Sequence, residues 1–488
     1  MRIHGLLLPI NPDSPEPLYL QLAKAVIAAI REGRLRPGET LPGTRELAEQ
    51  LKVHRNTVLQ AMRELQAQGW VVMKERAGVF VADVLPAFTP GSPPTPPSLE
   101  PSFVLPRPLD PLSTASTVKM DWSEGLADVR LAPTEAMAKA YQRAMRLKGE
   151  ELLSSGEFQG QRRLREALAL HVGQQRALSL QPDQILITRG TPMSLTLVAQ
   201  ALVGPEGGAV AVEDPGLPLI RDTLRQASGS VLHPVPVDGE GLRTGELAKL
   251  LETTRLNLLV VSPQAQAPTG VSLSPQRREE LWALARAHRF AILELDIEYD
   301  HLPGQALKPM AAEDKDGLVI YVGSLSRLLA PGLRLGFLAA PGDFAIKLAK
   351  ARQRMDWQGD RVVEWAVSEL ILDGDLGRHL RKVKKATQER RASLEAGLAA
   401  RFGASLAWTP HVGAMGLWAE GRGELLDPKR MEAWITACAL LGVRLRSGAF
   451  FDFHGGPLAA TRLGFTAYEP AELEQGLDLM AKALRPGA

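Results

Sequence analysis

Asp296 and Tyr299 carry side chains that could bind a nitrogen-containing ring. They stand three residues apart, directly after a mostly aliphatic run at 290–295 that predicts a strand. An aspartate can pair with a protonated pyridine nitrogen, and a tyrosine can donate a hydrogen bond to a ring oxygen. Ligands of α/β folds bind outside the carboxyl ends of strands, which is where this pair is expected. The alternative interpretation is a surface aspartate beside a packed tyrosine.

A second candidate site is the turn formed by Gly190 and Thr191, which follows a predicted strand and begins a predicted helix. Thr191 is a suitable helix cap, and Pro192 suits the first helical position. Free backbone N–H groups at such a turn can bind a phosphate group. Turns of this kind also connect strands to helices throughout α/β folds, so an ordinary connection is the alternative.

The residues that follow position 118 predict the scaffold for these motifs. Short aliphatic runs at 184–188, 209–213, 256–262 and 319–322 alternate with segments of helical spacing. This alternation is typical of a mostly parallel sheet with crossover helices. The expected fold class of this region is therefore α/β.

The first 80 residues predict a different, smaller structure. Apolar spacing predicts one helix over 18–31, a second that begins near Thr44 and a third that Arg55 opens, followed by two short strands around a basic turn at 74–78. A helix in the major groove presents its N-terminal side chains to base edges, and a basic hairpin reaches phosphates or the minor groove. The candidate DNA contacts are Arg45, His54, Arg55, Asn56, Thr57, Lys74, Arg76 and Gly78. The alternative is a small helical domain whose arginines are merely solvated.

A proline-rich stretch separates the two regions. Ten prolines lie from Pro86 to Pro111, mixed with Ser, Thr and Gly. Each proline fixes its own φ and removes a backbone donor, which predicts an extended linker.

The composition limits the class of protein. The chain has 57 Lys and Arg against 55 Asp and Glu, so a nucleic-acid site must be a local patch. Cys438 is the single cysteine, which excludes an intramolecular disulfide and a cysteine-based metal cluster and favours a reducing compartment. We expect no metal site. With neither a signal-peptide pattern nor an apolar run of membrane-spanning length, the protein is expected in the cytoplasm.

Three motifs of the N-terminal region together resemble a known DNA-binding family. The run 41–48 (LPGTRELA), the run 55–58 (RNTV) and Gly69-Trp70 closely resemble the GntR-type winged helix-turn-helix over residues 17–82. His54 departs from that pattern, which has Ser or Thr before the arginine. Histidine is a poorer helix cap that could instead contact a phosphate.

The run at 321–337, together with the loops at 213–216 and 268–270, resembles the MocR-type regulators. In that family a GntR-like reader is fused to a fold-type I, pyridoxal-phosphate-dependent aminotransferase domain, with a mostly parallel central sheet and a smaller C-terminal α+β subdomain. The resemblance implies four parts: a winged helix-turn-helix over 1–83, a linker over 84–118, a large domain over 119–375 and a small subdomain over 376–488.

The resemblance also implies roles for single residues and pyridoxal phosphate as cofactor. Asp296 would face the pyridine nitrogen, Ser324 and Arg334 would hold the phosphate, and Arg462 would bind a ligand carboxylate. Arginine suits both anions because its planar fork pairs with two oxygens at once; a structural ion pair is the alternative for each arginine. The candidate cofactor- or effector-binding residues are Gly190, Thr191, Asp296, Tyr299, Ser324, Ser326, Arg327, Arg334 and Arg462.

Arg327 breaks the family pattern, which has the Schiff-base lysine directly after Ser326. A guanidinium stays protonated and is not a competent nucleophile toward an aldehyde, so covalent attachment of pyridoxal phosphate is not expected. Leu295 and Ala265 also replace polar residues that are frequent in the family. We therefore predict no catalytic residue and no enzymatic activity.

The leading hypothesis is a ligand-responsive transcription regulator that binds double-stranded operator DNA. Its inactive aminotransferase-like domain would form a head-to-tail homodimer and sense an effector with a phosphate or carboxylate group, with noncovalent pyridoxal phosphate left open. Two alternatives remain: a working aminotransferase with a vestigial DNA reader, and a DNA-binding scaffold without a ligand.

Overall fold

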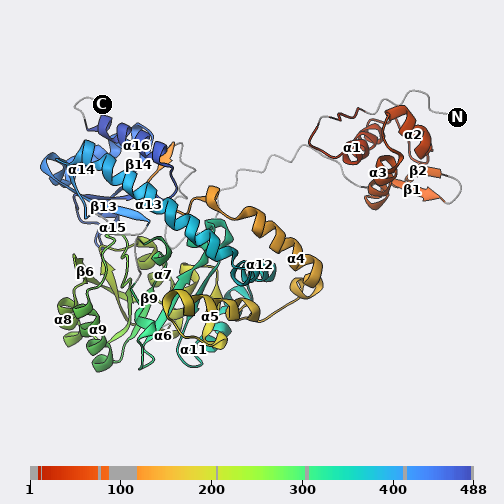
Figure 1. Cartoon of the computed structure of the whole chain (residues 1–488). Helices are drawn as coiled ribbons and strands as arrows, with labels where there is room; N and C mark the ends of the chain where they lie inside the picture. The colour runs from red at the N-terminus through yellow and green to blue at the C-terminus, as the bar shows by residue number, and fades with distance from the viewer. Residues whose placement is uncertain are drawn as a thin grey trace, which may run out of the picture. The chain divides into compact units, whose positions relative to one another are not determined.

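The chain forms two compact units, Met1–Pro111 and Leu112–Ala488, in the computed structural model (Figure 1). Their division falls inside the predicted linker, most of which lies outside the described residues. The structure describes residues 9–12, 14–74, 78–86, 118–204, 207–302, 307–409 and 415–484.

The N-terminal unit is a helix-turn-helix followed by a two-stranded hairpin. Its helices are α1 Leu18–Arg31, α2 Thr44–Leu51 and α3 Arg55–Ala67, and its strands are β1 Val71–Lys74 and β2 Gly78–Val81, paired antiparallel. The apolar faces of all three helices meet in one core around Val26, Leu47, Met62 and Trp70. The helices and the hairpin that the sequence predicts are thus confirmed.

The large unit is built on an eight-stranded sheet with the strand order β4-β11-β10-β9-β8-β5-β6-β7. The five central strands β10, β9, β8, β5 and β6 run parallel, while β11 and β7 pair antiparallel. The predicted α/β class with a mostly parallel sheet is confirmed. The strands are β4 Ile185–Thr188, β5 Ala209–Asp214, β6 Val231–Asp238, β7 Gly241–Leu242, β8 Leu256–Val261, β9 Ala291–Leu295, β10 Val319–Ser324 and β11 Gly336–Ala339.

Helices cover both faces of this sheet, because strands buried on both sides need apolar partners on each (Figure 1). Leu293 and Leu295 of β9 pack with α6 Thr191–Leu202, α7 Pro218–Ser228 and α11 Phe344–Asp356. The opposite face, which includes Ile292, packs with α5 Arg162–Arg176, α8 Thr244–Thr253, α9 Pro275–His288 and α12 Arg361–Leu372. Helix α4 Thr134–Leu153 packs along α12.

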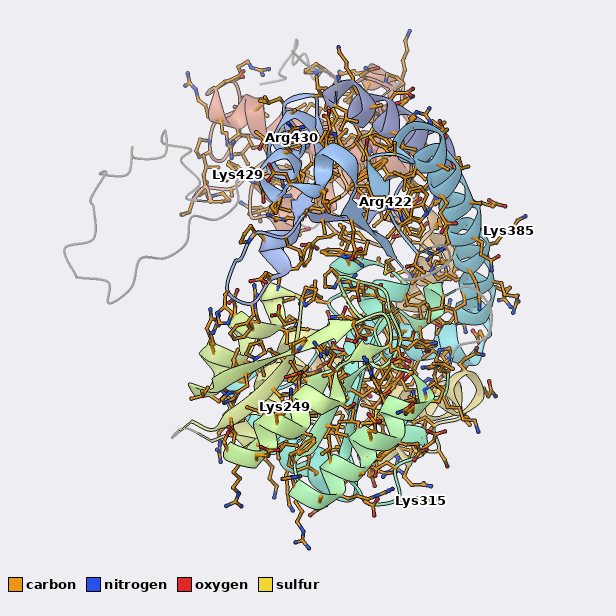
Figure 2. The ribbon with its side chains drawn as sticks, turned by 90° about the vertical axis from the view of Figure 1, so that its left-hand side faces the viewer. Lys249, Lys315, Lys385, Arg422, Lys429 and Arg430 are labelled. Atoms are coloured by element: carbon orange, nitrogen blue, oxygen red, sulfur yellow. The ribbon has the colours of Figure 1, made fainter. Side chains whose placement is uncertain are left out.

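The smaller subdomain contains a second, four-stranded antiparallel sheet with the order β12-β13-β16-β15. Its basic residue Arg430 lies at the opposite end of the unit from Lys249 of the large domain (Figure 2). Its elements are α13 Asp375–Phe402, β12 Leu406–Ala407, β13 Gly416–Gly421, α14 Pro428–Leu440, β14 Val443–Arg444, β15 Arg446–Ser447, α15 Gly448–Phe451, β16 Ala460–Gly464 and α16 Pro470–Ala483.

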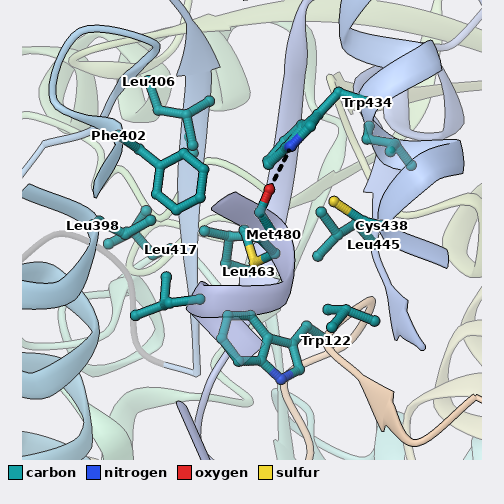
Figure 3. Close-up of a cluster of buried hydrophobic side chains, with 14 of the residues drawn as sticks. Trp122, Leu398, Phe402, Leu406, Leu417, Trp434, Cys438, Leu445, Leu463 and Met480 are labelled. Atoms are coloured by element: carbon teal, nitrogen blue, oxygen red, sulfur yellow. Dashed lines mark hydrogen bonds between the residues drawn. The ribbon is translucent and has the colours of Figure 1, made fainter. Parts of the chain in front are cut away.

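The core of this subdomain includes a segment from far upstream in the chain. Strand β3 Met120–Asp121 pairs in parallel with β14, and the adjacent Trp122 is fully buried among the side chains of α13, α14 and α16 (Figure 3). Trp434 Nε1 donates a hydrogen bond of 3.1 Å to the carbonyl oxygen of Met480 in the same core. The first residues of the predicted large domain therefore pack within the smaller subdomain.

No described helix is both long enough and apolar enough to span a bilayer. Among the same residues, no three His, Cys, Asp or Glu side chains are grouped so that they could hold a metal ion.

Cys438 on α14 should be unreactive in the folded protein. It is fully buried, and burial raises the pKa of its thiol to about 12. Since the thiolate is the reactive form, alkylation by iodoacetamide at pH 8 should be about 1,000-fold slower than for an exposed cysteine. The measurement is the intact mass over time. Leu440→Cys, two residues along the same helix and 84% exposed, is the matched control. Rapid labelling of native Cys438 would show that this core opens.

Candidate functional site

The first turn of α3 presents the predicted DNA contacts. Arg55 and Asn56 are exposed and Thr57 is half-buried, while Arg45 is exposed in the first turn of α2. The backbone N–H of Asn56 donates a hydrogen bond of 3.2 Å to His54 Nδ1. His54 therefore caps this helix with a ring nitrogen, as a hydroxyl oxygen would.

The hairpin, which follows α3 along the chain, contributes a basic side chain, Lys74. The Lys74 ammonium lies 4.8 Å from the centre of the Phe80 ring, which holds it at the end of β1. Gly78 has φ of 111°, a conformation that side-chain-bearing residues rarely adopt. Arg76 lies outside the described residues.

Two further exposed residues of α3 extend this surface and were missed in the sequence. Gln60 and Arg63 lie four and seven residues after Asn56, so they share its helical face. Helical spacing was the signal that could have identified them.

The large unit contains a cavity of about 220 Å³ at the carboxyl ends of the parallel strands. Six of the nine predicted cofactor or effector residues line it: Gly190, Thr191, Ser324, Ser326, Arg327 and Arg334. Much of the remaining wall is apolar and comes from Leu126, Pro192, Leu217, Leu219, Ile220, Leu295, Ile297 and Pro331. The cavity thus joins an apolar volume to a few polar groups, as small-molecule sites do.

One end of the cavity has the groups that the sequence suggested for an anion. Gly190, with φ of 90°, begins α6 there, and Arg334 is exposed and donates through Nη2 to the carbonyl oxygen of Arg189 at 3.0 Å. The two serines already have partners. Ser324 Oγ accepts from the N–H of Arg327 at 3.3 Å and caps α10 Leu325–Leu328, and Ser326 Oγ accepts from the N–H of Leu335 at 2.7 Å.

Only one edge of the Arg327 guanidinium makes hydrogen bonds to the described residues. Its Nη1 donates to the carbonyl oxygen of Gly125 at 2.7 Å and to Glu298 Oε1 at 3.2 Å. No described residue accepts from Nε or Nη2, and the side chain is 25% exposed. The second edge of the guanidinium is therefore available to a ligand in the cavity.

Glu298 is the buried partner of two arginines, and sequence reasoning missed it. Its Oε1 accepts from Arg327 and, at 3.3 Å, from Arg462 Nη2, while its Oε2 accepts from the N–H of Met415 at 3.2 Å. Burial raises the pKa of Glu298, but the charges of Arg462 and Arg327 outweigh it and hold the pKa below the ordinary value. The carboxylate therefore stays ionised at neutral pH. In the sequence, the only sign that Glu298 belongs to the site was its place as an acidic residue between Asp296 and Tyr299.

Arg462 does not line the cavity itself but contacts it through Glu298. Its side chain is 5% exposed, and burial lowers its pKa while Glu298 opposes that shift. The arginine expected to bind a ligand carboxylate is thus paired with a carboxylate of the protein.

Asp296 and Tyr299 do not lie in the cavity wall, contrary to the expectation from the sequence. Arg176 donates to Asp296 Oδ2 through Nε at 2.7 Å and Nη2 at 2.5 Å, and Tyr321 Oη donates to the same atom at 2.9 Å. The Arg176 guanidinium also lies 4.3 Å from the centre of the Tyr299 ring.

Strand alternation explains this arrangement. Successive side chains of a strand point to opposite faces, so Leu295 at the end of β9 lies in the cavity wall and the next residue, Asp296, is directed to the other side. Burial raises the pKa of Asp296 and Arg176 lowers it, with burial the larger effect.

Comparisons with known proteins agree with this architecture. Residues 117–479 match the family "Aminotransferase class I and II", and the chain belongs to it; residues 18–81 match "Bacterial regulatory proteins, gntR family". The chain therefore combines a GntR-type helix-turn-helix with a fold-type I aminotransferase fold.

Two relatives share both parts. The "HTH-type transcriptional regulator TauR" of Rhodobacter capsulatus is 29% identical over 489 residues, which cover 98% of each chain. The "Probable rhizopine catabolism regulatory protein MocR" of Rhizobium meliloti is 26% identical over 484 residues, which cover 98% of this chain and 96% of that protein. Among solved structures, LysN, an α-aminoadipate aminotransferase from Thermus thermophilus, matches with a TM-score of 0.68 and 26% identity, covering 75% of this chain and 92% of LysN.

The cavity does not fit pyridoxal phosphate in the manner of the catalytic members of this fold. Its aldehyde requires an amine. The described lining residues include no lysine, and Arg327 stands in the wall instead. The arginine in particular is tied to Gly125 and Glu298.

Asp296→Asn should destabilise the protein by about 3–5 kcal/mol, because it leaves the buried Arg176 guanidinium without a counterion. The two side chains are 2% and 3% exposed, so solvent does not screen the pair. Chemical denaturation of the full chain measures the effect.

The matched control is Glu135→Gln, which removes one partner of the exposed pair with Lys139 and should leave the denaturation midpoint unchanged. Equal midpoints for both variants would show that Asp296 has no structural role.

Proposed function

We propose that this protein is a DNA-binding transcription regulator whose aminotransferase-like domain binds a small effector without catalysing a reaction. The observation that carries the proposal is Arg327 in the wall of the cavity, ion-paired with Glu298. The match of residues 18–81 to bacterial regulatory proteins and the regulator names of the relatives support the DNA-binding role.

The absence of catalysis follows from the chemistry of Arg327. A guanidinium remains protonated at any physiological pH and cannot add to a carbonyl carbon or remove a substrate proton. It can still bind an anion firmly, through two parallel N–H groups. Three groups would hold such an effector: the free edge of Arg327, the exposed Arg334 and the start of α6 at Gly190.

We further propose a cytoplasmic homodimer arranged head to tail, in which the predicted linker at 84–118 lets two readers reach paired half-sites on operator DNA. Half-sites are commonly spaced by one or more turns of the double helix, and a long linker accommodates that spacing. The effector would then change the distance or orientation of the two readers.

Arg55→Ala should weaken operator binding by about 10- to 100-fold, because a base contact in the major groove is worth about 1–3 kcal/mol. Lys74→Ala should instead weaken binding to every sequence and reduce the slope of log K against log salt by about 1 for each copy bound to DNA. Fluorescence anisotropy measures both, on a duplex that the full-length protein selects from random sequence.

Lys249→Ala is the control for charge alone, since Lys249 is an exposed lysine on α8 of the large unit (Figure 2). If this variant lowered affinity as much as Arg55→Ala, the assignment of α3 as the reading helix would be wrong.

Incubation with pyridoxal phosphate followed by borohydride should leave no adduct on any residue that lines the cavity, since none of the described lining residues is a lysine. Peptide mass spectrometry locates any adduct. The matched variant Arg327→Lys restores an amine and should acquire the added mass at residue 327. An adduct in the cavity of the unchanged protein, or turnover of an amino acid, would favour the aminotransferase alternative.

A further inference from the structure

Glu298 connects the two parts of the large unit. It follows β9 of the eight-stranded sheet, whereas Arg462 belongs to β16 of the four-stranded sheet, and Met415 directly precedes β13 of that second sheet. Arg327 joins the same carboxylate from α10 of the large domain. One buried carboxylate thus holds groups from both subdomains.

We infer that Glu298 is a built-in carboxylate that occupies Arg462 in place of any ligand carboxylate, locks the two subdomains together and restricts the effector to molecules without a carboxylate at this end. The inference concerns Glu298 and rests on the proposed function only in naming the ligand of the cavity an effector.

The packing around Arg462 leaves no room for a second carboxylate. Its side chain and that of Glu298 are each 5% exposed. Gly416 lets the backbone of β13 lie close against the Arg462 side chain, because a Cβ at this position would lie 2.7 Å from Arg462 Nε. A ligand carboxylate could reach Arg462 only by displacing Glu298.

The charges in this region oppose such a displacement. Glu298 and Glu124 both line the cavity, so a ligand carboxylate would meet two negative charges. Arg327 and Arg462 both already donate to Glu298, and Arg391 adds a third positive charge near it. Displacing Glu298 from Arg462 would cost the buried carboxylate one of its two guanidinium partners, which is unfavourable in a protein interior.

The class of effector follows from the groups in the cavity wall that have no partner in the protein for part of their surface. The second edge of Arg327 and the exposed Arg334 can bind one anionic group, and the apolar wall can bind an uncharged organic part. A phosphate ester with an uncharged organic part meets these conditions. A ligand whose carboxylate must reach Arg462 does not, because that carboxylate would have to displace Glu298.

The test is chemical rescue of the full-length Glu298→Ala variant by acetate. Removal of the carboxylate leaves the buried Arg462 guanidinium without its counterion and takes the carboxylate partner from Arg327, so the melting temperature should fall by about 5 °C or more. Sodium acetate at millimolar concentrations should restore most of that loss in a saturable manner, because it binds the folded form alone. Sodium chloride at equal ionic strength should not.

Three proteins serve as controls for this rescue. The unchanged protein and Glu298→Gln, whose side chain keeps the space filled, should show no shift with acetate. The double variant Glu298→Ala/Arg462→Met should lose the rescue, because the arginine that binds acetate is gone. Should Glu298→Ala fail to fold in chloride, the yield of soluble protein refolded in acetate gives the same readout.

Two results would overturn the inference: an equal acetate shift in the unchanged protein, which would show that Arg462 is open to ligand carboxylates, or rescue that persists without Arg462. Neither result bears on operator binding or on the missing amine. Conversely, a lack of operator binding in every condition would contradict the proposed function but would not affect the inference about Glu298.

Discussion

The ionised carboxylate of Glu298 fixes the positions of the arginines at one end of the cavity. Two guanidinium groups from different subdomains converge on one of its oxygens, and a backbone N–H from the smaller subdomain satisfies the other. Glu298 and Arg462 are each 5% exposed, so neither buried charge is stable without the other. Glu298 also holds Arg327 with one edge of its guanidinium bound and the other edge free.

The large unit has the architecture of an aminotransferase, and several of its buried polar side chains pair with one another. Residues 117–479 match that family, and helices cover both faces of a mostly parallel sheet. Asp296 pairs with Arg176, and Leu295 stands in the cavity wall. A fold sets where a site lies, and the side chains set what the site can do.

Several features could be predicted from local sequence because they depend on neighbours along the chain. The three helices and the hairpin of the N-terminal unit follow from apolar spacing and from glycine at turns, and the parallel sheet follows from alternating aliphatic runs. Arg327 could be identified from its place after Ser326. Arg176 and Glu298 could not, because their partners lie between 29 and 164 residues away in the sequence.

The sequence by itself determined the two kinds of domain, the turns that contain Gly190, Ser324 and Arg334, and the lack of an amine at residue 327. Only the tertiary structure decided that these turns line one cavity, which face of β9 meets it, and that Arg462 is paired with Glu298. The physical reason is that secondary structure follows from the periodicity of neighbouring residues, whereas ion pairs between subdomains depend on how the two sheets pack. That packing is set by the whole apolar core.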